Sequence, residues 1–343
     1  MAYTSIDKPS DYFNTKLYTG NGTNATGITG VGFQPDWVWC KQRSGADNHV
    51  TSDAVRGGNK QIYVNLIDAE TSSTSMLQSF NSDGFTLGTD GAVNQNSATY
   101  ASWNWKAGTS FSNSAGANSA TIASTGSINT DAGFSIISYT GNGASNDTAK
   151  IAHGLGVAAN MIIVKCRNAA GGWQTSSTSL GWNNVLRMEQ TSASSSGTYA
   201  FGVSGVTPTS TVFTVAATSG GNHTNTNSNT YIAYCFAEKK GYSKFGTYTG
   251  NGSNDGPFIY TGLKPAFIIV KKYNTSENWL MADNKINPFN FADGFFACQN
   301  TNAESNMNIA TGLDLLSNGI KMRDSDGTIN SSGGQYFFMA FAE

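Results

Sequence analysis

The sequence contains little charge, and this limits the partners it can be expected to bind. Only 12% of its 343 residues are Asp, Glu, Lys or Arg, and the formal net charge is −2 at pH 7. Globular proteins carry about 25% charged residues. The longest basic clusters are the pairs Lys239-Lys240 and Lys271-Lys272. Binding to nucleic acid needs a basic face that releases counterions, so nucleic acid is not an expected partner.

Long apolar runs and a signal sequence are also missing. No stretch approaches the roughly 18 apolar residues that suggest a membrane-spanning helix, so membrane insertion is not expected. The N-terminal residues Met1 to Lys8 lack a basic segment followed by an apolar core. We therefore expect no signal peptide.

Cysteine and histidine are scarce, which argues against metal sites and nucleophilic catalysis. No CxxC spacing suggests zinc, and the cysteines do not recur at equivalent positions, so we expect buried free thiols rather than disulfides. No Gly-x-Ser-x-Gly elbow accompanies the histidines, which we expect at the surface or in turns. We expect no catalytic residue, no metal and no cofactor. The residues concerned are Cys40, Cys166, Cys235, Cys298, His49, His153 and His223.

Repetition is what the sequence has in abundance. The pentapeptide Tyr-Thr-Gly-Asn-Gly occurs three times, and each copy precedes an apolar run that ends in lysine and, later, an aromatic strand. The pentapeptides begin at Tyr18, Tyr139 and Tyr248, the runs end at Lys41, Lys165 and Lys271, and the aromatic strands begin at Tyr100, Tyr231 and Tyr336. Three ordered landmarks repeated three times predict three tandem copies of one domain of roughly 100 residues, each with its own hydrophobic core.

The turns and the periodicity predict the fold class. Aromatic residues make up 12% of the chain, and no stretch longer than about ten residues shows helical periodicity. We predict an all-β protein of three tandem antiparallel β-sandwich repeats, jelly-roll-like in type. The expected organisation is an N-terminal arm at 1–10, a first repeat at 11–108, a Ser/Gly/Ala-rich linker at 109–132, a second repeat at 133–240 and a third repeat at 241–343.

The repeated pentapeptide itself predicts a turn at the end of a strand. Gly-Asn-Gly tolerates positive φ, whereas a phosphate loop would need a Gly-Lys-Ser/Thr ending and a following helix, and neither is found. The expected turn residues are Gly20, Asn21, Gly22, Gly141, Asn142, Gly143, Gly250, Asn251 and Gly252.

Tryptophan provides the candidates for ligand binding. Trp37, Trp39, Trp103 and Trp105 lie in strands at i, i+2 spacing, which favours core packing. Three others lie in or near loops rich in Gly, Ser and Asn. Their indole faces could stack on sugar rings while neighbouring amides and hydroxyls bind sugar hydroxyls, with core packing as the alternative. These candidates are Trp173, Trp182 and Trp279.

Carboxylates of the first repeat leave one enzymatic alternative open. Glycoside hydrolysis needs two acids near each other, and Asp53, Asp68 and Glu70 all belong to this repeat. The tripeptide Asp68-Ala69-Glu70 is matched in the third repeat by Asn302-Ala303-Glu304, at a comparable distance before a hairpin turn. We expect a non-enzymatic protein, with a polysaccharide depolymerase as the alternative from another class.

Several longer segments carry a resemblance that extends over nearly the whole chain. They are Asp11 to Thr15, Tyr18 to Gly22, Ile28 to Asp36, Ser82 to Gly88, Tyr234 to Glu238 and Gly241 to Gly246. With these segments the sequence resembles a family of bacteriophage virion proteins, found especially in phages of aquatic bacteria and commonly labelled tail-fibre or structural proteins.

The resemblance implies a place on a virus particle rather than a reaction. It implies a non-enzymatic virion structural protein, a tail-fibre or peripheral appendage component that contacts host-surface polysaccharide. Its partners would be other virion proteins and further copies of itself, with a trimer expected by analogy. A virion location after synthesis in the host cytoplasm agrees with free thiols and the lack of a signal peptide. A capsid decoration or head-fibre protein is the alternative within the virion.

Overall fold

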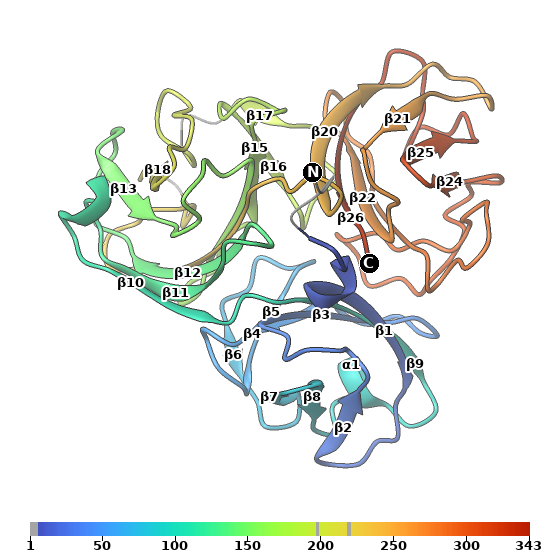
Figure 1. Ribbon diagram of the computed structural model, residues 1–343, viewed down its shortest axis with the longest axis horizontal. Helices are drawn as coiled ribbons and strands as arrows, with labels where there is room; N and C mark the ends of the chain where they lie inside the picture. Colours follow the sequence, from blue (N-terminus) through green and yellow to red (C-terminus); the bar gives the residue numbers. More distant parts are fainter. Residues whose placement is uncertain (1–5, 197–198, 218–220) are drawn as a thin grey trace.

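The chain forms three lobes around a common centre (Figure 1). The computed structural model describes residues 6–196, 199–217 and 221–343. Nearly all regular structure in the described residues is antiparallel β, which confirms the predicted all-β sandwich class. The helical segments are the single turns η1 (Pro9–Asp11), α1 (Gly91–Asn94) and η2 (Ala117–Ser119).

The first lobe is a sandwich of a large sheet, in the order β1-β9-β3-β4-β5-β6, and a small sheet, in the order β2-β8-β7. Its strands are β1 (Phe13–Thr19), β2 (Thr26–Thr29), β3 (Trp37–Gln42), β4 (Val50–Asp53), β5 (Lys60–Tyr63), β6 (Thr71–Ser72), β7 (Leu77–Asn81), β8 (Gly84–Leu87) and β9 (Thr99–Trp105).

The second lobe has a large sheet in the order β10-β11-β12-β19-β14-β15-β16-β17 and a small sheet made of β13 and β18. Its strands are β10 (Thr109–Asn113), β11 (Ser124–Asn129), β12 (Phe134–Thr140), β13 (Ala149–Ala152), β14 (Met161–Cys166), β15 (Gln174–Ser177), β16 (Asn184–Arg187), β17 (Ser195–Ser196), β18 (Val212–Val215) and β19 (Thr230–Phe236).

The third lobe has a large sheet in the order β20-β26-β22-β23 and a small sheet in the order β21-β25-β24. Its strands are β20 (Ser243–Thr249), β21 (Phe258–Tyr260), β22 (Phe267–Lys272), β23 (Trp279–Asp283), β24 (Leu313–Leu316), β25 (Gly319–Met322) and β26 (Gln335–Phe341).

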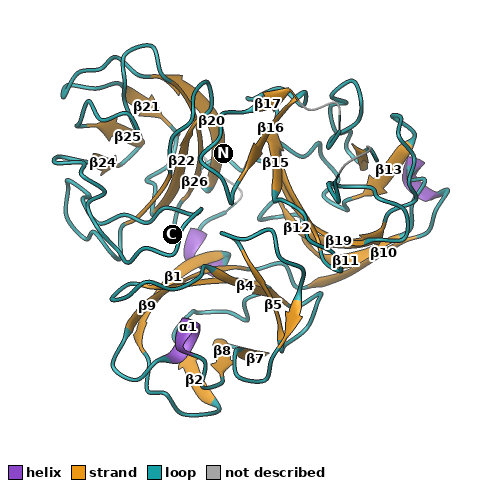
Figure 2. Cartoon of the chain, turned by 180° about the vertical axis from the view of Figure 1, so that it is seen from behind, coloured by secondary structure: helices purple, strands orange, loops and turns teal. Residues whose placement is uncertain are grey.

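The three lobes use the same strand pairing. In each, the opening strand of the repeat (β1, β12 or β20) pairs with the closing strand (β9, β19 or β26). The closing strand pairs on its other side with β3, β14 or β22, and the strand between these two in sequence (β2, β13 or β21) lies in the small sheet. The register agrees as well, because Trp37, Met161 and Phe267 open the third strand and face the end of the closing strand. The large sheets face the centre and the small sheets lie at the periphery (Figures 1 and 2).

The middle strands of each large sheet are buried on both faces, and their alternate side chains point to opposite sides. Along β3, Val38 and Cys40 point into a core inside the first lobe, while Trp37 and Trp39 point to the centre. The strands β14 and β22 divide their side chains in the same way. Each lobe therefore owns a core, as expected, but it also contributes to a shared core that sequence analysis did not foresee.

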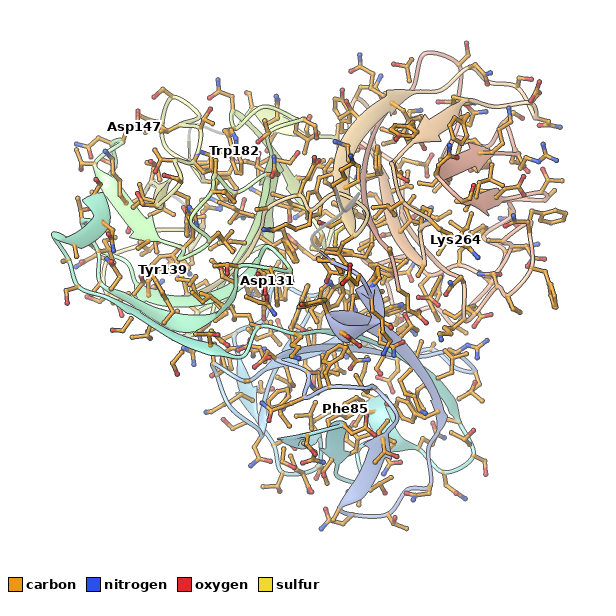
Figure 3. The ribbon with its side chains drawn as sticks, in the orientation of Figure 1. Phe85, Asp131, Tyr139, Asp147, Trp182 and Lys264 are labelled. Atoms are coloured by element: carbon orange, nitrogen blue, oxygen red, sulfur yellow. The ribbon has the colours of Figure 1, made fainter. Side chains whose placement is uncertain are left out.

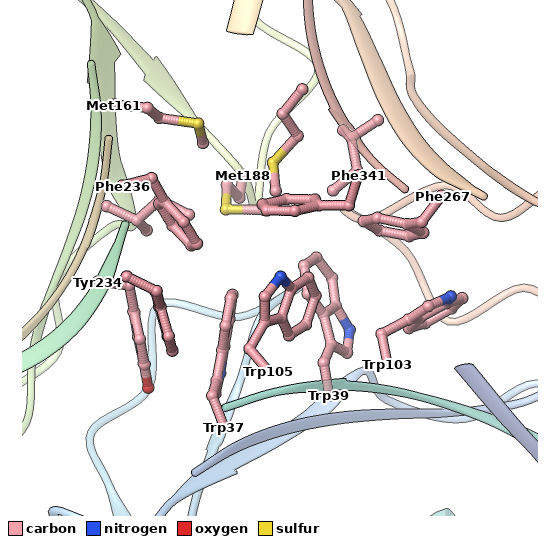
Figure 4. Packing of buried hydrophobic residues seen from close by; sticks show 14 of the residues in the cluster. Trp37, Trp39, Trp103, Trp105, Met161, Met188, Tyr234, Phe236, Phe267 and Phe341 are labelled. Atoms are coloured by element: carbon pink, nitrogen blue, oxygen red, sulfur yellow. The ribbon is translucent and has the colours of Figure 1, made fainter. Parts of the chain in front are cut away.

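Aromatic rings from all three lobes form this shared core, which we call the central cluster (Figure 4). The ring of Trp37 stacks on Trp105 of its own lobe and on Tyr234 of the second lobe, with centroids 4.3 Å apart in both pairs. Phe341 of the third lobe meets Trp105 at 5.7 Å and Phe236 of the second lobe at 5.8 Å. The lobes are thus joined through a dry aromatic interior.

The segment 109–132 is not a linker, and that prediction is wrong. Its strands β10 and β11 extend the large sheet of the second lobe, with β11 paired to β12 from Ser124 through Asn129. A Ser/Thr/Gly composition suits an edge hairpin with one solvated face as well as it suits a flexible linker, so composition did not separate the two.

The N-terminal arm is anchored where the structure describes it. Ile6 is 2% exposed and packs in the central cluster, and η1 begins three residues later at Pro9. Residues 1–5 of the predicted arm lie outside the described residues. All four cysteines are free and buried, as predicted.

Candidate functional site

The repeated pentapeptide forms the same turn in each lobe. Gly20 N–H donates to Ala98 O (2.8 Å), and Asn21 N–H donates to the side-chain oxygen of the buried Asn94 (3.0 Å). Asn225 and Asn330 receive the equivalent bonds in the other lobes. A Cβ at Gly20 would lie 2.3 Å from Gln95 O, so only glycine fits there. The pentapeptide therefore has a structural role.

The lysines that end the three apolar runs are fully buried. Nζ of Lys165 donates to Ile67 O (2.9 Å) and Asp68 O (2.8 Å) of the first lobe. Nζ of Lys271 donates to Thr191 O of the second lobe (2.8 Å), and Nζ of Lys41 donates to Thr301 O of the third (3.2 Å). Burial lowers the pKa of each lysine to about 8.

These bonds run in one direction around the molecule. Each lobe inserts its lysine into a loop of the preceding lobe, and the first lobe reaches the third, so the circle closes. We call each lysine together with the loop that receives it a seam. Backbone bonds repeat in every seam: Glu70 N–H donates to Arg167 O, Ser194 N–H donates to Tyr273 O, and Glu304 N–H donates to Arg43 O.

The candidate sugar-binding residues Trp173 and Trp279 lie in the seams, each 1% exposed. Trp173 Nε1–H donates to Tyr63 O of the first lobe (3.0 Å), and Trp279 Nε1–H donates to Arg187 O of the second (3.0 Å). Neither offers a face to a ligand, so the predicted role is wrong for both. Loops rich in Ser, Gly and Asn occur both at sugar-binding sites and at contacts between lobes, so the composition around these tryptophans could not distinguish the two.

Trp182 is also buried, at 3% exposure, inside the second lobe (Figure 3). Its ring makes an edge contact with Phe201, with the centroids 5.5 Å apart. It belongs to the core of that lobe, so the prediction that it stacks on sugar is wrong as well.

The histidines also differ from expectation. His49 and His153 are fully buried, so the surface position is wrong for both, although each lies outside the strands, in the connection before β4 or after β13. His49 stands one residue before the start of β4, as Trp173 and Trp279 stand near the start of β15 and β23, and its Nε2 lies 3.1 Å from Ala297 O of the third lobe. Burial holds the pKa of His49 well below its usual value. This residue is the first-lobe counterpart of the seam tryptophans.

The acids that suggested hydrolysis serve the seam between the first two lobes. Asp53 is fully buried, forms an ion pair with Arg56, and accepts a bond from Tyr234 of the second lobe (2.8 Å). Glu70 accepts from Arg167 of the second lobe at 2.9 Å. Both carboxylates are therefore neutralised by arginine inside an interface. Among the described residues, no cluster of His, Cys, Asp and Glu could hold a metal ion.

The third lobe has a cavity of about 330 Å³ lined chiefly by amides. It lies in the long connection between β23 and β24, next to the seam with the first lobe. Asn278, the residue before Trp279, is part of its lining. The other lining residues are Phe295, Ala297, Asn300, Asn302, Ala303, Ser305, Asn306, Met307 and Asn308. Convergent amides in a concave site are suited to bind the hydroxyl groups of a sugar.

Exposed aromatic rings also gather on the third lobe. Within the described part of the chain, the large aromatic residues classed as exposed all belong to it: Phe258 at 46%, Tyr260 at 62%, Phe289 at 82% and Phe291 at 43%. Tyr260 lines a groove of about 390 Å³ together with Ser243, Lys244 and Lys240. The second lobe has a hollow of similar size, about 380 Å³, so it is the exposed rings that distinguish the third lobe.

Comparison with known families adds a classification. A family model described as "Domain of unknown function (DUF7483)" matches residues 8–343. The match spans all three lobes, so the family is defined by the whole three-lobed arrangement, which we call the ring, and not by a single repeat. No curated protein matches the chain. No helix in the described residues has the length and apolar character needed to cross a membrane.

Proposed function

From the premise that the chain belongs to the DUF7483 family, we propose that it is a non-enzymatic structural protein of a bacteriophage virion. In this proposal it is a tail-fibre or peripheral appendage component, and its third lobe contacts polysaccharide on the host surface. The resemblance in sequence supports the virion assignment, and the geometry supports the division between scaffold and contact site.

The observation that carries the proposal is the closed ring of seams. The shared aromatic interior and three lysine-to-loop contacts hold the lobes in one fixed arrangement. A particle component must keep its shape outside a cell. In this ring every lobe contacts both of the others, so no lobe can separate without breaking two interfaces. The three-fold arrangement that a fibre usually obtains from three chains is present here within one.

The amide-lined cavity supports the contact with polysaccharide. Asn302 and Asn306 are exposed at its rim, and an amide both donates and accepts hydrogen bonds. The seam between the first and third lobes holds the loop that lines the cavity, since Glu304 of this loop forms an ion pair with Arg43 of the first lobe (2.5 Å). A rigid polar site loses little entropy when it binds a flexible glycan.

Binding of purified protein to host cells and to their isolated polysaccharide tests the proposal. We expect Asn302→Ala with Asn306→Ala to weaken binding by about tenfold or more, because each lost hydrogen bond contributes roughly 1 kcal/mol. Asn254→Ala is the matched control, since Asn254 is exposed on the same lobe away from the cavity. Undetectable binding of the unaltered protein at high micromolar concentration would reject the glycan contact and leave the structural role.

A capsid decoration protein is the second candidate, and the three-lobed ring favours it. Icosahedral shells present three-fold positions that one ring of three similar lobes could cover. Labelled antibody and electron microscopy of intact particles distinguish the two: label on the tail or its fibres supports the first proposal, and label spread over the head supports the second.

A further inference from the structure

Each small sheet ends in an edge strand, and the three edges differ in their side chains and in what covers them. The second strand of each repeat forms this edge, with Ile28, Ile151 and Ile259 as its buried central residue. The residue before that isoleucine is Gly27 in the first lobe, Lys150 in the second and Phe258 in the third.

In the second lobe the edge is covered by the chain itself. Thr121 N–H and Ile122 N–H both donate to Lys150 O, at 2.9 and 3.1 Å, and Lys150 N–H donates to the Thr121 hydroxyl (2.8 Å). Ile122 forms a parallel β-bridge with Ile151. Ala120 and Phe111 pack over Ala152. The segment between β10 and β11 thus acts as an added strand on β13.

In the third lobe no equivalent segment exists, because β20 follows the second lobe after a short junction. Met322 N–H donates to Pro257 O and Thr261 N–H donates to Asn318 O, so these alternate positions face β25. Ile259, midway between them, faces β25 as well, and in an antiparallel pair these positions alternate with residues, Phe258 among them, whose N–H and C=O turn the other way. The backbone groups of Phe258 therefore point outward from β21, which is the end strand of its sheet.

The side chains on this edge are large. A Cβ at Gly319 would lie 2.6 Å from the Phe258 ring, so the edge of the ring packs against that glycine. Tyr260 borders the groove of about 390 Å³, which runs between β21 and the start of β20 at Ser243. The second lobe has the flexible Lys150 and the small Ala152 at the matching positions, and Phe111 of β10 supplies the large ring.

We infer that β21 is a docking edge for an extended segment of another polypeptide, which adds to the sheet as residues 120–122 add to β13. Because the large rings are here on the edge itself, the segment that fits should carry small and hydroxyl side chains, such as Ala, Ser, Thr and Gly. Main-chain bonds to Phe258 supply affinity, and the rings select small side chains, the usual division in β-strand addition. A second copy of this chain cannot supply residues 120–122 without uncovering its own second lobe.

A blocked synthetic peptide that copies residues 117–125, with alanine in place of Ile122, is the probe, since it keeps the backbone of the segment that the second lobe already binds but carries only small and polar side chains. We expect millimolar peptide to slow hydrogen exchange at the Phe258 amide of the intact protein at least severalfold. The Ile259 amide, which faces β25, should not change. Exchange at Phe258 that stays fast at saturating peptide overturns the inference, as does protection confined to β13.

Two variants separate the backbone contact from the ring contact. Phe258→Pro removes the ring together with the outward N–H, a change that an edge strand tolerates, and should bind the peptide about tenfold more weakly than Phe258→Ala, which loses only the ring. Phe258→Ala keeps the N–H and should still bind segments with small side chains while losing its discrimination against large ones. Equal binding by all three proteins contradicts the inference. If sedimentation shows dimers that form through β21 and that the peptide does not dissociate, the occupant of this edge is a second copy of the chain instead.

Discussion

The central cluster and the cores inside the lobes are built from the same strands but hold different parts together. The lobe cores join two sheets of one repeat and are largely aliphatic in the second and third lobes, around residues such as Ile162 and Ile268. The central cluster joins three repeats and contains five tryptophan residues from the first two lobes. A repeat thus has its own interior and yet is completed by its neighbours. The predictions below test this difference, beginning with the largest effect.

Removing the ring at the middle of the central cluster should have the largest effect. Trp37→Ala removes stacking on both Trp105 and Tyr234 and should cost about 3–5 kcal/mol of unfolding free energy. Because the ring joins the lobes, we expect one cooperative urea transition that moves to lower concentration for probes in every lobe. Ile162→Ala, inside the second lobe, is the comparison. A separate transition for the first lobe in Trp37→Ala would mean that the lobes fold independently.

A seam should be the next most sensitive feature. Lys165→Met removes the donor to the carbonyls of Asp68 and Gly171, and one of the two donors to the carbonyl of Ile67, at a cost of about 2–3 kcal/mol in urea unfolding. Lys264→Met is the control, because Lys264 is exposed on the third lobe and should change stability by less than about 0.5 kcal/mol (Figure 3). Equal effects of the two variants would show that the seam does not stabilise the ring.

The seams also predict an unusual dependence on pH. The folded pKa of each seam lysine is about 8, below the ordinary value of 10.5, so the unfolded chain binds more protons between these values. The seam lysines therefore add to the free energy of unfolding as the pH rises from about 8 to about 10, and this contribution is lost as the pH falls through the folded pKa. The buried thiols, whose pKa burial raises, act in the opposite direction over the same range, so the test compares urea midpoints of the unaltered protein with those of Lys165→Met. The difference in unfolding free energy between the two should grow in favour of the unaltered protein as the pH rises, and a difference that does not change with pH contradicts the assignment.

The smallest effect belongs to the turns, which are alike in all lobes. Tyr100→Phe removes the hydroxyl that donates to Gly91 O and accepts from Gln95 N–H, and should cost about 1 kcal/mol. Tyr336→Phe removes the same two contacts in the third lobe, to Gly327 O and from Ser331 N–H. Thermal unfolding should give similar losses for both. Losses that differ by several kcal/mol would mean that the turns are not equivalent.

Repetition in the sequence predicted the strands but not how the lobes meet. The runs ending at Lys41, Lys165 and Lys271 were recognisable because burial on both faces leaves a continuous apolar signal. Their acceptors are backbone carbonyls of another repeat, and a carbonyl has no sequence signature. One clue was available: Asp68-Ala69-Glu70 and Asn302-Ala303-Glu304 have a third counterpart, Ser192-Ala193-Ser194, in the same loop of the second repeat.

The candidate site was the least predictable part. Trp173 and Trp279 were selected for their polar surroundings, but those surroundings are seam loops that bury the indoles. The aligned position in the first repeat is His49, and a histidine aligned with two tryptophans does not resemble a repeated landmark. The amide-lined cavity depends on asparagines in the connection between β23 and β24, and the corresponding loops of the other repeats do not carry them, so the comparison between repeats did not point to it.

The bond from Lys41 to Thr301 closes the circle between the first and last lobes of one chain. A ring assembled from three identical subunits would show every surface feature three times and could gain avidity from all of them. In a single polypeptide the three lobes can differ. The edge of the second lobe is covered by residues 120–122, the edge of the first carries Gly27, and the edge of the third carries Phe258. The stoichiometry follows directly: each ring offers one β21 and should take one strand, and attachment to a multivalent surface then depends on how many rings stand side by side.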